Sequence, residues 1–380
     1  SKEVRTELVG SLDQLERVKT ISDIYINPEF DSVLESRFIE SLKRMSGIAG
    51  LPPVKLLQDI VNGKSGFMLD LGGQRFRIEP QRNVDASDGV SVASKPDFMI
   101  WPWSSGGPRR PIAVFCDGWE HHQHSIRDDA LKRSALVASG RFWIWSITHD
   151  DVTKALAGDP TSDLDSPLVA LALHSGEAAT AVLPRAQQNA FTFNAVILLL
   201  QYLATPTSGV VDPAAVQLQK NAMWLNFLMI PSNENEKQLV DTAMNHWLPQ
   251  LPPEMRSPGT SYAPCLSRQD SQPTVLGWWP LSYLKSQEGT LEAPGLVLLD
   301  DSKISENSQQ RLNWRRWLQL FNTLQTLKGF RLASLSGLQG KDLELLHDSD
   351  IQLQPSTPSQ SSQIALAQEW QDVIADSLTT

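Results

Sequence analysis

Cysteine is scarce in this sequence, with two residues, Cys116 and Cys265, in a chain of 380. Two thiols are too few for a disulfide framework or a four-thiolate zinc site, which favours a reducing compartment, the cytoplasm. Long apolar runs are missing as well, because stretches such as 195–200 are far shorter than the roughly 20 residues that span a bilayer. We therefore expect a cytoplasmic protein that has no membrane partner.

Positive charge is also in short supply, since the formal net charge is -10. Nucleic-acid phosphates are neutralised by clustered Lys and Arg, so this balance excludes a protein coated in nucleic-acid-binding surface but not a local groove. The basic residues that cluster lie in the first half of the chain: Arg75, Arg77, Arg82, Arg109, Arg110, Arg127, Lys132, Arg133 and Arg141. They are either solvated faces of a hairpin and a helix or the lining of such a groove.

Apolar spacing in the first half predicts an α/β arrangement. Residues 31–45 carry one apolar stripe of an amphipathic helix, with Glu35 beside it. The alternating segments FMLDL and RFRIE flank Gly72-Gly73 and predict a β-hairpin. Two buried strands, KPDFMIWP and PIAVFCDG, precede a helix at 126–139 and the apolar strand FWIWSI. The predicted order is one helix, three or four strands, a helix and a strand.

The second half has a different texture, with apolar helical stretches, a Pro-rich break near 249–264 and a strand-like GLVLLDD. We predict a helical lead-in at 1–28, an α/β domain at 29–155, a mostly helical α+β domain at 160–350, and a linker with a terminal helix at 351–380. The amphipathic helix near 313–327 is rich in tryptophan, which favours packing over a nucleic-acid platform. Because the chain opens with Ser in charged, helix-like sequence, we expect a piece of a longer polypeptide.

Acidic residues and histidines gather where two predicted strands begin and end. Asp97 opens the strand KPDFMI, and about 20 residues later a second strand closes in the turn FCDGWEHH. Phosphodiester hydrolysis by a metal needs carboxylate oxygens that hold a hard cation such as magnesium, which activates water and shields the charge of the phosphate. Asp97 has the chemistry of a metal ligand, although a Pro-Asp pair is also common where a strand follows a loop.

Two other signals do not support ATP binding. Gly63-Lys64-Ser65 looks like the end of a phosphate loop, but Gln58 stands where that pattern requires Gly, and we expect no strand before it. The run ending in Asp300 and Asp301 is interpreted as a strand that enters a turn.

Four features together resemble the very-short-patch repair endonucleases and related domains of the PD-(D/E)XK superfamily. In family order they are a helix with Glu35, the Pro-Asp-Phe strand start at Asp97, the Val-Phe-Cys-Asp-Gly-Trp-Glu-His turn at 114–121, and a helix with Asp129, Lys132, Leu136 and Gly140. Lys132 replaces the Arg of the related domains. The strand after Gly140 matches the last core strand, so the resemblance covers about 125 residues and implies a restriction-endonuclease-like mixed sheet flanked by helices.

The resemblance implies roles for particular residues. Asp97 would be the principal ligand of Mg²⁺ or Mn²⁺, and Glu35 would lie near the same ion or its water. Either His121 or His122 would act near the phosphate as an acid, a base or a hydrogen-bond donor. DNA would be the partner, and we expect Arg109, Arg110, Lys132 and Arg133 to contact its phosphates.

The chain departs from the superfamily where a Glu and a Lys usually stand two residues apart. Those positions are Phe115 and Asp117 here. The repair-endonuclease branch accepts an apolar residue and uses a backbone carbonyl as a ligand, which would be that of Cys116, but it has His at the position of Asp117. Asp117 is thus a replacement ligand, an ordinary turn residue, or the mark of an inactive site.

Glu35 and the histidines have structural alternatives too. The spacing from Ser32 to Glu35 is that of a capping box, so Glu35 is either a helix-capping residue or a metal-site carboxylate, or both. His121, His122 and His124 would otherwise be exposed loop residues.

A looser resemblance links GRFWIWSITHDDV to the carboxyl-terminal ends of large DEAD/DEAH-type helicases of bacterial phage-defence systems, Druantia among them. It implies a helicase portion amino-terminal to this segment in the same polypeptide. The sequence therefore predicts a magnesium-dependent DNA endonuclease domain; the alternative is a nuclease-like module that binds DNA or docks a protein without hydrolysis.

Overall fold

The computed structural model describes the chain in several segments. These are residues 30, 32–103, 107–162, 193–207, 211–228, 238, 242, 245, 247–251, 260–263, 275–280, 295–303, 308–327 and 329–346. The predicted lead-in at 1–28, the terminal helix at 351–380 and Cys265 lie outside them. No helix within this part of the chain is long and apolar enough to cross a membrane.

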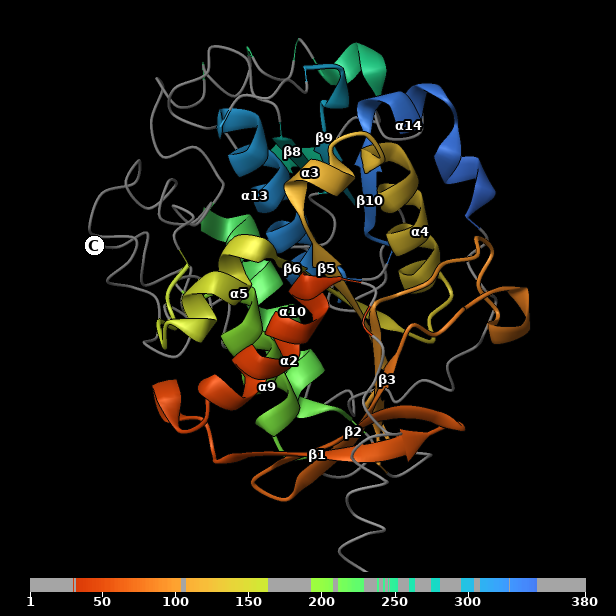
Figure 1. Ribbon diagram of the computed structural model, residues 1–380. Coiled ribbons are helices and arrows are strands. Elements are labelled where there is room, and N and C mark those ends of the chain that lie inside the picture. Colours follow the sequence, from red (N-terminus) through yellow and green to blue (C-terminus); the bar gives the residue numbers. More distant parts are fainter. Residues whose placement is uncertain are drawn as a thin grey trace, which may run out of the picture.

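A six-stranded mixed sheet forms the centre of the molecule (Figure 1). Its strands, in spatial and chain order, are β1 (Val54–Val61), β2 (Lys64–Leu71), β3 (Gln74–Pro80), β4 (Phe98–Pro102), β5 (Ile112–Asp117) and β6 (Trp143–Thr148). Neighbours are antiparallel except β5 and β6, which are parallel. Parallel neighbours need a crossover, and α4 (Ile126–Ala138) supplies it. The predicted α/β class, a mixed sheet flanked by helices, is confirmed.

The hairpin at Gly72-Gly73 is confirmed as β2 and β3, but a preceding strand was not predicted. β1 pairs with β2 through a tight turn in which Asn62 and Gly63 have positive φ, the geometry of a two-residue hairpin. The expectation that no strand precedes Gly63-Lys64-Ser65 is therefore wrong. Gly63 lies in the hairpin turn, and Lys64 and Ser65 begin β2, so this segment is not a strand-to-helix phosphate loop.

One face of the sheet is covered by helices α2 (Val33–Arg44), α5 (His149–Leu156), α9 (Ala195–Ala204) and α10 (Pro213–Leu228), which lie together in Figure 1. The predicted stripe of α2 packs here through Phe38 and Leu42, which are fully buried. The alternate residues of β5 divide between the two faces: Val114 and Cys116 belong to this core, whereas Phe115 belongs to the opposite one.

The opposite face is covered by α4 and by α13 (Ser308–Leu324), with a smaller sheet beyond them. That sheet has the order β10-β9-β8-β7, and its strands are β7 (Thr260–Ala263), β8 (Val275–Pro280), β9 (Leu296–Leu299) and β10 (Arg331–Ser334). The remaining elements are the helices α3 (Trp119–His122) and α14 (Leu335–Gln339) and the 3-10 turns Ile48–Gly50, Ala86–Asp88, Leu248–Gln250, Asp301–Lys303 and Asp342–Leu345.

Helix α13 also closes an edge of the central sheet. The Asn322 side chain accepts a hydrogen bond from the Ser146 N–H and donates one to the Ser146 carbonyl, both at 2.8 Å. Gln325 pairs with Ile144 in the same way, at 2.7 and 2.6 Å. Ser146 and Ile144 belong to β6, the last strand in the sheet order. Two amide side chains thus take the place of a seventh strand.

The predicted tryptophan helix packs in the core, as expected. Trp314 and Trp317 of α13 are 2% and 0% exposed. Asp300 and Asp301 follow β9 directly and begin a 3-10 turn, which confirms the interpretation of a strand that enters a turn.

Packing crosses the domain boundary that the sequence predicts near residue 160. The core beneath α2 includes residues of α9 as well as β1 to β6, and the opposite core joins α4 and β5 to α13 and β10. Each face of the central sheet is therefore completed by the second half of the chain. The division into domains at 155 and 160 stays a prediction, but it is not a division between separate cores.

Candidate functional site

The candidate site lies where β5 ends and β4 begins. Antiparallel pairing places Phe98 opposite Val114, so that Asp97, one residue before β4, reaches the carboxyl end of β5. The Cys116 backbone N–H donates a hydrogen bond of 2.6 Å to Asp97 Oδ2. Asp97 thus meets the last residues of β5.

The Asp97 carboxyl is in an environment that disfavours its charge. Its pKa is raised from 3.8 to about 7, mainly by burial and also by the nearby carboxylates of Glu35 and Asp117. The hydrogen bond from Cys116 and the charge of His122 act in the opposite direction but do not compensate. An added cation beside Asp97 would therefore relieve an unfavourable concentration of negative charge.

Glu35 caps its helix and also belongs to this acidic neighbourhood. The N-cap Ser32 accepts a hydrogen bond from the Glu35 backbone N–H, and its hydroxyl donates to Glu35 Oε1 at 2.9 Å. Glu35 Oε2 accepts from Gln81 Nε2 at 2.7 Å, and the residue is 2% exposed. Both roles left open by the sequence are thus compatible: the amino end of α2 holds Glu35 in place while its charge acts on Asp97.

Asp117 is buried and paired with a cation from α4. Its Oδ1 accepts a hydrogen bond from Arg133 Nη2, while its Oδ2, also buried, has no hydrogen-bond partner among the residues that the structure describes. Arg133 itself is 1% exposed, donates to Ser146 Oγ at 3.1 Å and lies 4.4 Å above the ring of Phe115. Phe115, the apolar residue at the usual carboxylate position, therefore packs against this arginine.

The structure distinguishes between the tandem histidines. His121 is exposed, whereas His122 is partly buried and its Nδ1 bonds Asp129 Oδ2 at 2.7 Å. Its Nε2 lies 3.6 Å from Asp117 Oδ1. Burial alone would lower the pKa of His122, but the hydrogen bond with Asp129 and the charge of Asp117 outweigh it and raise that pKa.

Asp129 is a site residue to which sequence reasoning gave no role. Burial would raise its pKa, but the hydrogen bond from His122 and the charge of Arg133 lower it. Its spacing of seven residues from His122, across a helix start, was the available signal.

Two of the four residues expected to contact phosphates are instead buried and paired with carboxylates of the protein. Arg133 is paired with Asp117, and Arg109 is 6% exposed and bonds Asp212 through Nε and Nη2 at 3.1 and 2.9 Å. Their burial corrects the expectation of a surface role. Arg110 stacks over Trp143 at 4.2 Å, and Lys132 on α4 pairs with Asp128, so these two remain the partly exposed members of the set.

The side chains around Asp97 can be compared with the ligands that divalent ions require. Within the described residues, no group of three or more His, Cys, Asp and Glu side chains is arranged to hold a metal. Mg²⁺, however, is commonly held by one or two carboxylates together with waters and substrate phosphates, and it takes oxygen ligands. Asp97, with the orphaned Oδ2 of Asp117 nearby, fits that open arrangement and does not fit a closed zinc cage.

Comparison with known proteins gave no relative: no protein-family model, curated protein or solved structure matches this chain.

Proposed function

We propose that the region from Glu35 to Thr148 is a metal-dependent DNA endonuclease domain of the PD-(D/E)XK type. The observation that carries the proposal is the meeting of Asp97, Glu35 and Asp117 at one strand end, with the pKa of Asp97 raised to about 7 by burial and by the other two carboxylates. A buried carboxyl such as that of Asp97, whose charge is disfavoured by burial and by two neighbouring carboxylates, is typical of functional sites rather than of packing. The topology, a helix and a sheet whose last strand returns parallel through α4, supports the same fold.

Asp97 would hold the Mg²⁺ or Mn²⁺ ion, with Glu35 beside it. When bound, the ion would activate water and shield the charge that develops on the scissile phosphate. The Cys116 N–H fixes one oxygen of Asp97 and so orients the carboxylate. Asp129 holds His122 through Nδ1, which leaves the proton on Nε2 as the one that His122 exchanges at the site.

Substitution of Asp97→Asn tests this function. The change keeps the size of the side chain and an acceptor for the Cys116 N–H but removes the charge that holds the cation. We expect cleavage of duplex, nicked, mismatched or single-stranded DNA with Mg²⁺ or Mn²⁺ to fall by about 100-fold or more, while DNA binding and folding persist. Asp128→Asn, the same substitution on the exposed face of α4, is the matched control and should cut like the wild type.

A nuclease-like module without hydrolysis is the second candidate, and a specific observation favours it. Phe115 stands at a usual carboxylate position, and Asp117 Oδ1 is occupied by Arg133. Wild-type protein that binds DNA but cuts none of these substrates with either ion would establish this reading. Equal cutting by wild type and Asp97→Asn would instead place the ion elsewhere. The helicase portion and the phage-defence role stay predictions from the sequence.

A further inference from the structure

A pocket of about 300 Å³ opens at the other end of β4 from Asp97. It is formed where β3 begins, where β4 ends and where the loop before β5 meets the end of α9. The six steps of extended chain from Asp97 to Trp103 span roughly 20 Å. This pocket is therefore separate from the carboxylates, and its volume is at the lower end of the range that holds small ligands.

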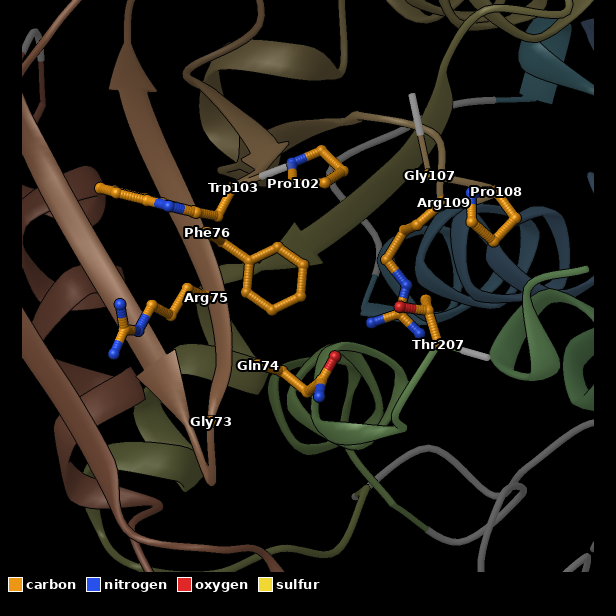
Figure 2. Close-up of a pocket in the computed structure, with 10 residues that line it drawn as sticks. All are labelled: Gly73, Gln74, Arg75, Phe76, Pro102, Trp103, Gly107, Pro108, Arg109 and Thr207. Atoms are coloured by element: carbon orange, nitrogen blue, oxygen red, sulfur yellow. The ribbon is translucent and has the colours of Figure 1, made fainter. Parts of the chain in front are cut away.

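Phe76 and Arg109 lie close together where they line the pocket. The Phe76 ring lies 5.8 Å from the guanidinium of Arg109, and Figure 2 shows these two side chains facing each other. Arg109 is held by Asp212 and by the carbonyls of Leu203 and Thr205, at 2.9 and 2.7 Å. Because its charge is already balanced by Asp212, Arg109 is not a free site for an anion.

Polar groups line the rim. Gln74 and the exposed Thr207 both line the pocket, and an amide with a hydroxyl can supply donors and acceptors to the edge of a planar ligand. The Phe76 ring and Pro102, together with this amide and hydroxyl, suit an aromatic heterocycle.

Two residues that also line the pocket, Trp103 and Arg75, bring an exposed ring and a cation to it. Trp103 is 43% exposed, and the Arg77 guanidinium lies 4.4 Å from its ring. The Arg75 side chain is 55% exposed and meets Asp70 at 3.5 Å. In Figure 2 the side chains of Arg75 and Trp103, two residues that also line the pocket, extend away from Arg109.

We propose that this strand end binds single-stranded nucleic acid, with one base in the pocket and a neighbouring base stacked on Trp103. Arg75 and Arg77 would contact the phosphates that join the two nucleotides. Exposed aromatic rings beside arginines are the usual means of holding unpaired bases, and stacking accepts any base. A base within a duplex is not free to enter a pocket, so the chemistry selects unpaired strands.

This inference rests on the proposed function for its class of ligand, nucleic acid, but needs no hydrolysis. It is tested by the fluorescence anisotropy of a labelled oligothymidylate of about twelve nucleotides, within the usual site size. The full chain is used with EDTA, so that no divalent ion is present. We expect Trp103→Leu and Arg77→Gln each to weaken binding about tenfold. Thr207→Trp, which fills the pocket from an exposed position, should do the same.

Matched controls separate this surface from general charge. Lys43→Gln removes an exposed cation on α2 and should leave binding unchanged. Duplex DNA of the same length should compete at least about tenfold less well than the single strand. Thymidine monophosphate should compete weakly, because it occupies the pocket without reaching Trp103.

The outcomes are decisive in both directions. Equal binding of duplex and single strand, or binding unaffected by Trp103→Leu and Thr207→Trp, would overturn the inference. Competition by thymidine monophosphate as strong as that of the strand would assign the pocket to a free nucleotide and overturn the stacked neighbour. Wild type that cuts nothing but binds single strands through Trp103 would remove the endonuclease proposal and leave this one standing. Cleavage that persists without Trp103-dependent binding would do the reverse.

Discussion

At the residue scale, the protonation of Asp97 affects both the stability of the folded state and the candidate site. Its pKa is raised from 3.8 to about 7, so the folded protein binds this proton more tightly than the unfolded chain does. The folded state should therefore lose stability as the pH rises from about 4 through about 7. Asp97→Asn removes this titration, and we expect the variant to gain stability relative to wild type across that window.

Urea unfolding of both proteins near pH 5 and near pH 8 measures this difference, because other titrating groups cancel. Adding Mg²⁺ at the higher pH should stabilise the wild type but not the variant, since a ligand that binds only the folded state shifts the equilibrium. Stability curves that stay parallel across the window would contradict the raised pKa.

The pairing of Arg133 with Asp117 gives a second expectation at this scale. Arg133→Met leaves a fully buried carboxylate without its cation, which costs about 3–5 kcal/mol of unfolding free energy. Adding Asp117→Asn should recover most of that loss, because the uncompensated charge is then gone.

Lys132→Met, one residue earlier on the more exposed side of α4, is the control and should change stability by no more than about 0.5 kcal/mol. Chemical denaturation of the wild type, Arg133→Met, Asp117→Asn and the double variant completes the cycle. A small effect of Arg133→Met would contradict the buried ion pair and favour the contact with DNA phosphates that the sequence suggested.

At the element scale, α13 satisfies the edge of β6, and its amides can be tested individually. Gln325 directly follows α13. Gln325→Leu replaces its amide side chain by an apolar one of similar size and leaves the buried Ile144 N–H and carbonyl unpaired. We expect a loss of about 2 kcal/mol or more, and a greater tendency to aggregate through the open edge.

Asn322→Leu should behave like Gln325→Leu, whereas Thr323→Ala on the same helix should not. Urea midpoints measure the loss, and light scattering at rising protein concentration follows association. Stability that is unchanged in both leucine variants would show that water or another group replaces the amides.

The elements that the sequence predicted are those whose apolar residues have a clear period. The helix at 31–45, the hairpin at Gly72-Gly73, the helix ended by Gly140 and the strand after it all appear in the structure. β1 was missed because both sides of it are largely solvent-exposed, with Leu57 and Ile60 57% and 60% exposed, so no alternation marks it.

The site was predictable to a similar extent. Asp97 lies beside the end of β5 because β4 and β5 pair through their backbones, and the order of these strands can be read from the sequence. Residue type alone does not reveal burial, so Arg109 and Arg133 were assigned to the surface although Asp212 and Asp117 hold them inside. Those partners lie on other elements, and a charge can be matched to its partner only after the elements are packed.

At the scale of the whole molecule, the two halves of the described chain complete one another. Both faces of the central sheet bury apolar residues of the second half, so a fragment of residues 30–162 would expose two large apolar surfaces. We expect that fragment to aggregate or remain unfolded, and the full chain to unfold with both halves together.

Tryptophan fluorescence and far-ultraviolet circular dichroism, followed through urea unfolding of the full chain, should report one shared transition. Limited proteolysis offers an independent comparison with the fragment. A fragment that unfolds cooperatively at the midpoint of the full chain would show that 29–155 is an autonomous domain, as the sequence predicted.

The amide pairing of β6 has a consequence for synthesis. Ser146 and Ile144 bond Asn322 and Gln325, which are synthesised 176 and 181 residues later. At ribosomal speeds of about 5–20 residues per second, β6 would have an open edge for about 10–35 s before Gln325 is made. During that interval the nascent chain offers an unpaired apolar strand to any neighbour on the same message. Slower translation between these segments should therefore lower the yield of folded protein and increase its demand for chaperones.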